Sequence, residues 1–184
     1  MLRNDMHSWT RPLRPVIFAL ALMAANAAAA ASYCGDMMMP PAALKNVGRG
    51  FSAWHSGIDL LAPQGSPVRA AADGTVIFAG RYFGYGNMVD LRHADGVVTR
   101  YAHLSAFAPG LHPGTVLRMG EPLGRIGATG RATTPHVHFE VRVNGHAVDP
   151  KPALGLAACP GAPAPREPIE EALAPEDHSG GWAR

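Results

Sequence analysis

A short segment with strictly alternating residue types constrains the fold of this chain most. Every second residue of the stretch HVHFEVR, residues 136–142, is apolar. These apolar positions are Val137, Phe139 and Val141. Successive side chains of a β-strand point to opposite sides of its sheet, so a period of two predicts a strand with one apolar face. The opposite face carries His136, His138, Glu140 and Arg142.

Two histidines on one strand face are a candidate site. Side chains at positions i and i+2 of a strand point the same way, with Cα atoms roughly 6–7 Å apart. The imidazoles of His136 and His138 can therefore reach a common point, such as a metal ion or its bound water. The alternative is a solvated polar strand face, and the His-x-His pair alone does not decide between the two.

Composition and turn residues indicate the fold class. The 184 residues include 21 glycines and 17 prolines, and only 16% are charged, which favours short strands and turns over helices. The expected hairpin turns are Asp73-Gly74, Ala94-Asp95-Gly96 and Asn144-Gly145, the last of type I′. No segment of residues 49–152 has a clear helical period. We therefore expect an all-β, mostly antiparallel fold.

Four parts are expected along the chain. Residues 1–31 have the basic start, apolar middle and small-residue end of a cleaved signal peptide. Residues 32–48 are an extended lead-in, residues 49–152 the folded domain, and residues 153–184 a Pro- and Ala-rich tail that we expect to be disordered. The alternative for the first part is a membrane anchor. Its apolar stretch is short, which favours a signal peptide that is cleaved off. The mature protein is then expected to have no stable membrane anchor and to be exported to the periplasm or the medium.

Charge and cysteine content bear on partners and compartment. The net charge is +2 and the basic residues are scattered, so no nucleic-acid partner is expected. Export leads to an oxidising compartment, where an even number of cysteines favours a disulfide. Cys34 and Cys159 would then tie the lead-in to the end of the domain; two free thiols are the alternative.

A second candidate segment is WHSGIDLLAP, which contains His55 and Asp59. On a straight strand these two residues would share a face but stand roughly 13 Å apart, too far to share a metal ion. Gly57 lies between them and permits a sharp bend. The segment can bind a metal only if the chain turns there, and a polar pair near a turn is the alternative.

A third candidate is His103 in RYAHLS, at the end of an expected strand. Taken alone, it also fits a partly buried histidine at the end of a hairpin. The other histidines match no motif, and we expect them on the surface. They are His7, His93, His112, His146 and His178.

Together these segments resemble a known family. The motifs HSGID, AAADGTV, GYGN, YAHLS and PHVHFEVR occur in this order, and residues 49–152 resemble the lysostaphin/LytM-type peptidoglycan metallopeptidases. The resemblance implies the duplicated hybrid motif fold of that family. It also implies one zinc ion held by His55, Asp59 and His138, with a fourth position open for water. His103 and His136 would be catalytic residues that do not bind the metal.

The implied function is a zinc endopeptidase. It would hydrolyse peptide cross-links between peptidoglycan stem peptides, with D-alanyl–diaminopimelate bonds expected, by attack of a zinc-bound water. The alternative is a non-catalytic LytM-like module that binds or activates other cell-wall hydrolases; such relatives typically lack zinc ligands that this chain retains.

Two departures from the family pattern bear on specificity. The segment before His55, RGFSAWHSGID, is abbreviated, so one wall of the substrate groove is expected to be missing or rebuilt. Thr134 stands where the family often has glycine, in a loop expected to border the site.

Overall fold

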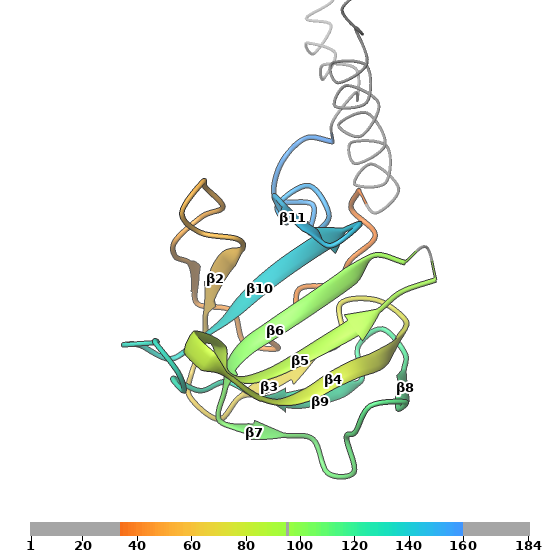
Figure 1. Cartoon of the computed structure of the whole chain (residues 1–184). Coiled ribbons are helices and arrows are strands. Elements are labelled where there is room, and N and C mark those ends of the chain that lie inside the picture. The colour runs from red at the N-terminus through yellow and green to blue at the C-terminus, as the bar shows by residue number, and fades with distance from the viewer. Residues whose placement is uncertain (1–33, 95, 160–184) are drawn as a thin grey trace, which may run out of the picture.

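Figure 1 shows a computed structural model of the chain, in which residues 34–94 and 96–159 are described. The expected signal peptide, residues 1–31, lies outside these residues, as does the part of the expected tail from residue 160 to residue 184. Within the described ranges, no helix is long and apolar enough to cross a membrane.

Two antiparallel β-sheets make up the described part of the chain. The larger sheet has the strand order β1-β2-β10-β6-β5-β4-β8, with β11 paired to β10, and the smaller has the order β3-β9-β7. The strands are β1 (Asn46–Val47), β2 (Ile58–Leu61), β3 (Pro67–Arg69), β4 (Gly74–Tyr82), β5 (Gly86–Arg92), β6 (Val98–Leu104), β7 (Ala106–Phe107), β8 (Val116–Leu117), β9 (Pro122–Arg125), β10 (His136–Val143) and β11 (His146–Val148). One short 3-10 helix, η1 (Phe83–Tyr85), joins β4 to β5. The predicted all-β, mostly antiparallel fold is confirmed.

The core lies between the two sheets. The alternating apolar residues of β10 are buried, and they join one cluster with Ile58 and Leu60 of β2, Val68 of β3 and Leu123 of β9. The smaller sheet thus covers the apolar face of the larger one, and Figure 1 shows β3 and β9 behind β4 and β5. The opposite face of β10 is also buried, because Glu140 is fully enclosed and both histidines are nearly so. The solvated-face alternative for β10 is therefore wrong.

Two of the three expected hairpins are confirmed. Asn144 and Gly145 have positive φ angles of 50° and 80°, as a type I′ turn requires, and they connect the paired strands β10 and β11. Strands β5 and β6 pair across residues 93–97. The expected hairpin at Asp73-Gly74 is wrong, because β3 pairs with β9 whereas β4 pairs with β5 and β8. The chain crosses from one sheet to the other at this point.

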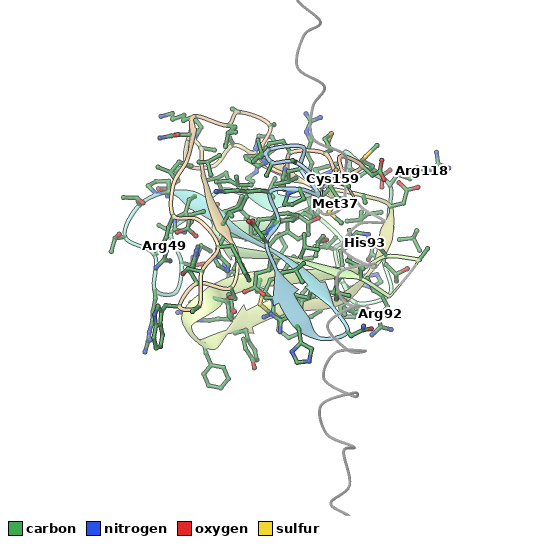
Figure 2. All side chains as sticks on the ribbon, turned by 90° about the horizontal axis from the view of Figure 1, so that it is seen from above. Met37, Arg49, Arg92, His93, Arg118 and Cys159 are labelled. Atoms are coloured by element: carbon green, nitrogen blue, oxygen red, sulfur yellow. A yellow bond between two sulfur atoms is a disulfide. The ribbon has the colours of Figure 1, made fainter. Side chains whose placement is uncertain are left out.

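The lead-in is fastened to the end of the domain. Cys34 and Cys159 form the expected disulfide, which closes a sequence separation of 125 residues. The backbone N–H of Met37 donates to Ala153 O at 3.1 Å, and the Met37 side chain is buried in the core. Pro41 forms a bridge with Val68, so the lead-in runs along β3. Figure 2 places Met37 and Cys159 on the side of the molecule away from Arg49.

His93 is buried, so its predicted surface position is wrong. Its Nδ1 lies 2.7 Å from the carbonyl oxygen of Asp73, which can only accept, so Nδ1 carries the proton. Its Nε2 lies 2.8 Å from the hydroxyl of Thr99, which in turn lies 2.9 Å from the hydroxyl of Tyr101. Burial lowers the pKa of His93 below the ordinary value and outweighs the hydrogen bond to Asp73. Of the other unassigned histidines, His112 and His146 are exposed, and His7 and His178 lie outside the described residues.

The buried His93 makes folding stability depend on pH. Because its pKa is lower in the folded chain than in the unfolded chain, the unfolded state binds more protons, and stability falls as pH drops below about 6.5. We expect wild type to lose more stability than His93→Gln between neutral and mildly acidic pH. The difference in slope is at most about 1.4 kcal/mol per pH unit, since one proton is involved. Urea unfolding across this range, with His112→Gln as the exposed control, measures it; parallel curves for wild type and His93→Gln would contradict the assignment.

Candidate metal centre

Three side-chain atoms from two paired strands and the preceding turn form a tight triangle. Asp59 of β2 lies directly opposite His138 of β10 in the antiparallel register, and His55 lies just before β2. Asp59 Oδ1 is 3.1 Å from His55 Nε2 and 3.0 Å from His138 Nδ1, and these two nitrogens are 3.0 Å apart. The predicted ligand residues are therefore brought together at one point.

The chain bends at Ser56 and Gly57, between His55 and Asp59, as a shared metal site required. Ser52 and His55 exchange backbone hydrogen bonds of 3.0 and 3.1 Å, and β2 begins only at Ile58. The reason for glycine at position 57 is close approach of backbones. A Cβ atom on Gly57 would collide with the carbonyl oxygen of Phe139 in β10. Gly57 thus lets the two strands approach where the triangle forms.

Hydrogen bonds fix which nitrogen of each histidine faces the triangle. His55 Nδ1 donates to Gly50 O at 2.7 Å, which leaves Nε2 without a proton. His138 Nε2 donates to Glu140 Oε1 at 3.0 Å, which leaves Nδ1 free. Both free nitrogens point toward Asp59 Oδ1, and Asp59 Oδ2 accepts from Arg49 Nε at 3.2 Å. The three atoms are donors of an electron pair, as metal ligands must be.

Glu140 supports the centre, although no motif in the sequence assigned it a role. Burial raises its pKa, but hydrogen bonds from His138, Ser56, Tyr85 and Arg142 outweigh burial and leave the pKa at about 2. Ser56 Oγ and Tyr85 OH donate to Oε1 at 2.6 and 2.7 Å. A buried carboxylate that holds the second nitrogen of a metal-binding histidine fixes the orientation of that ring. Its position two residues after His138 was visible in the sequence, but its donors from distant segments were not.

His103 and His136 lie beside the triangle with one nitrogen each unprotonated. Their Nδ1 atoms donate to Thr129 O at 2.7 Å and to Thr134 O at 2.8 Å. His136 Nε2 is buried, has no hydrogen-bond partner among the described residues, and lies 3.5 Å from Asp59 Oδ1. The two rings are 4.8 Å apart between centroids. Both predicted catalytic residues therefore border the three candidate ligands.

A β-bulge turns His103 toward the site. In a regular strand His103 would share the face of Thr99 and Tyr101, which points into the core. The β5–β6 register shifts between Asn87 and Val89, and His103 has a φ of +63°. An extra residue reverses the side-chain alternation beyond it. The bulge thus places His103 on the other face of the sheet, next to His136 and His138.

Two cavities border the centre. One, of about 440 Å³, is lined by His55, His103 and His138 together with the exposed aromatic residues Trp54, Tyr82 and Phe83. The other, of about 330 Å³, is lined by Asp59, His103 and His136 and by residues 131–134. The short segment before His55 forms part of the first wall through Trp54, which is 96% exposed. Thr134 lines the second cavity, so the loop around it borders the site as expected.

The donor set fits a zinc ion. Two imidazole nitrogens and one carboxylate oxygen form a ligand set typical of catalytic zinc. Tetrahedral bonds of about 2.0–2.1 Å place ligand atoms roughly 3.3 Å apart. The edges of the triangle, 3.0 to 3.1 Å, are close to this spacing. Among the described residues, His55, Asp59 and His138 form the group of three that could hold a metal ion.

Comparison with known proteins identifies the family. Residues 53–150 match Peptidase family M23. The chain belongs to this family. It is 58% identical over 96 residues to the DD-carboxypeptidase/endopeptidase Mpg of Neisseria meningitidis, a match that covers 52% of this chain and 22% of that protein. The chain thus spans about a fifth of the length of this curated relative.

Solved structures share the fold. A zinc containing peptidase from Vibrio cholerae superposes with a TM-score of 0.58 and 31% identity, over 64% of this chain and 39% of that one. The catalytic domain of lysostaphin from Staphylococcus simulans superposes with a TM-score of 0.56 and 31% identity, over 60% of this chain and 92% of that one. The resemblance to lysostaphin-type M23 peptidases read from the motifs is confirmed.

The close approach at Gly57 predicts a structural effect of adding one methyl group. We expect Gly57→Ala to lower the free energy of unfolding by about 1–3 kcal/mol, because the β2–β10 pair must shift to accommodate it. Gly50→Ala is the matched control, since its Cβ would lie 3.7 Å from Lys151 Nζ, an ordinary contact. Urea unfolding measures both variants. Equal stability of Gly57→Ala and wild type would contradict the close approach.

Proposed function

We propose that this chain is a zinc-dependent endopeptidase that cleaves peptide cross-links of peptidoglycan, at D-alanyl–diaminopimelate bonds. The observation that carries the proposal is the triangle of His55, Asp59 and His138, with the unprotonated nitrogens of His103 and His136 beside it. In this proposal the first three residues hold one zinc ion and the last two act on the substrate. A module that only binds other hydrolases needs no such arrangement.

Bound zinc would act as a Lewis acid that polarises the scissile carbonyl and lowers the pKa of water. The remaining tasks fall to histidines of the chain. His103 and His136 each have an Nε2 that can accept a proton from the attacking water. Once protonated, the same atom can donate to the developing oxyanion and then to the leaving amine. Their Nδ1–H bonds to backbone carbonyls hold both rings in the orientation that these transfers need.

Peptidoglycan is supported as the substrate by the relatives. One is named a DD-carboxypeptidase/endopeptidase, and another, from Vibrio cholerae and 38% identical over 97 residues, is named Peptidoglycan DD-endopeptidase ShyC. The Cys34–Cys159 disulfide fits an exported protein, and the proposed compartment is the periplasm. The signal-like sequence of residues 1–31 agrees with this location.

Digestion of purified cross-linked muropeptides tests the function. We expect the zinc-loaded protein to convert D-alanyl–diaminopimelate dimers to monomers, identified by mass spectrometry. Dimers with glycine bridges should remain intact. If zinc-loaded protein leaves every dimer intact, the chain is not an endopeptidase on this substrate, and the binding-module alternative gains support.

The proposed ligand set makes a direct prediction about metal content. We expect one zinc per chain in wild type, and loss of stoichiometric zinc in His138→Ala, because this change removes one of the three ligand atoms. His146→Ala is the matched control, since His146 is exposed on β11. Elemental analysis after dialysis measures both. A full equivalent of zinc in His138→Ala would refute its assignment as a ligand.

The proposed acid–base residues should affect turnover without affecting zinc. A positioned acid or base contributes about 10²–10⁴-fold to rate, so His103→Ala and His136→Ala should lose turnover in this range and still bind zinc. His112→Ala, at an exposed histidine, should cleave like wild type. Steady-state cleavage rates and zinc content, measured on the same preparations, decide the point. Rates like those of wild type in either variant would remove that residue from the mechanism.

A further inference from the structure

We propose that Arg131 binds the free carboxylate of the residue that follows the scissile bond. This inference rests on the proposed function and names the chemical group by which the site selects its substrate. Bonds whose leaving residue carries a carboxylate next to the amide nitrogen would be preferred, and glycine bridges, which lack this group, would be poor substrates.

Arg131 stands where the two cavities meet. Both cavities are lined by Arg131, His103 and Arg49, so these residues form the junction through which a bound peptide would pass. His103 is one of the two candidate catalytic residues. A side chain at this junction lies within reach of groups close to the scissile bond.

The backbone around Arg131 is held firmly in place. Its N–H donates to Gly84 O at 2.8 Å. The stem of its side chain packs over Gly84, so that a Cβ atom on Gly84 would lie 3.3 Å from Arg131 Cδ. Two residues earlier, Thr129 accepts the Nδ1–H of His103 through its carbonyl and binds Leu104 O and Asn87 N through its hydroxyl. The segment that orients His103 therefore also positions Arg131.

The junction of the two cavities carries a positive charge that no carboxylate of the described residues pairs with. The charged residues that line the two cavities, apart from histidines, are Arg49, Arg131 and Asp59. Arg49 already donates to Asp59. Arg131 is an exposed residue, and its side chain forms no ion pair with the described residues. An arginine fork binds a carboxylate through two parallel hydrogen bonds, which a lysine or a neutral side chain does not reproduce.

The chemistry of the proposed substrate supplies the matching group. In a D-alanyl–diaminopimelate cross-link, the amide nitrogen is attached to a carbon that also bears a free carboxylate. A terminal D-alanyl–D-alanine has the same arrangement. A glycine bridge has an uncharged peptide unit at this position. Arg131 would therefore discriminate by one charge located next to the bond that is cut.

A pair of substrates that differ only in this carboxylate tests the inference. One is the cross-linked muropeptide dimer with the free carboxylate, and the other is the same dimer with that carboxylate amidated. We expect amidation to raise the KM of wild type about 10- to 100-fold with little change in kcat, as for loss of a charge-assisted hydrogen bond that forms in the bound substrate. Arg131→Gln should show this higher KM for the free acid and no further increase on amidation.

Arg118→Gln is the matched control, because it removes the same charge from an exposed arginine at the end of the molecule away from Arg49 (Figure 2). It should behave like wild type. If Arg131→Gln weakens both substrates equally, or neither, the inference is overturned while the endopeptidase function stands. Calorimetric titration of the two muropeptides into wild type and Arg131→Gln measures the same contrast without turnover. The difference in binding therefore decides the role of Arg131 even if the protein cleaves neither substrate. Absence of cleavage would overturn only the proposed function.

Discussion

The antiparallel pairing of β2 with β10 is the constraint on which the rest of the site depends. It places His138 opposite Asp59 and Val137 opposite Leu60. The register that buries the apolar residues of both strands is thus the same register that brings the candidate ligands together. A slip by one residue would turn every side chain of the strand to the other face. Core packing therefore selects the geometry of the candidate metal centre, and no other contact is needed to align the candidate ligands.

His103 is the exception, because its strand alone would point it into the core. The bulge in β6 reverses its direction, and its positive φ is a conformation that costs of order 1–3 kcal/mol for a residue other than glycine. Thr129 offsets this cost by binding the His103 ring and the backbone of Leu104 and Asn87. Strain of this kind persists only where surrounding contacts fix the backbone, and here they fix it beside the candidate ligands.

The sequence predicted the fold class and named five residues that the structure brings together, but these two predictions had different grounds. Alternation in HVHFEVR predicted β10, and the long distance between His55 and Asp59 on a straight strand predicted a bend between them. The order of motifs, through the family resemblance, distinguished His138 from His136. Local patterns failed where pairing is not local: Asp73-Gly74 joins two sheets, and His93 is enclosed by Asp73 and Thr99. Glu140 was missed because its role depends on donors that lie 84 and 55 residues away.

The candidate ligands and the walls of the two cavities come from different kinds of structure. We call the paired strands that carry the ligands the floor, and the loops that line the cavities the rim. The candidate ligands lie on paired strands and an adjoining turn, and the disulfide fastens the chain on the side away from Arg49 (Figure 2). The lead-in runs along β3. Of its described residues, 34–48, Gly48 lines the second cavity and the others line neither cavity. The rim consists of the turn at Trp54, the short helix η1 and the loop that carries Arg131 and Thr134. Because loops tolerate substitution better than paired strands do, selectivity for one peptide bond over another can change at the rim while the floor is preserved.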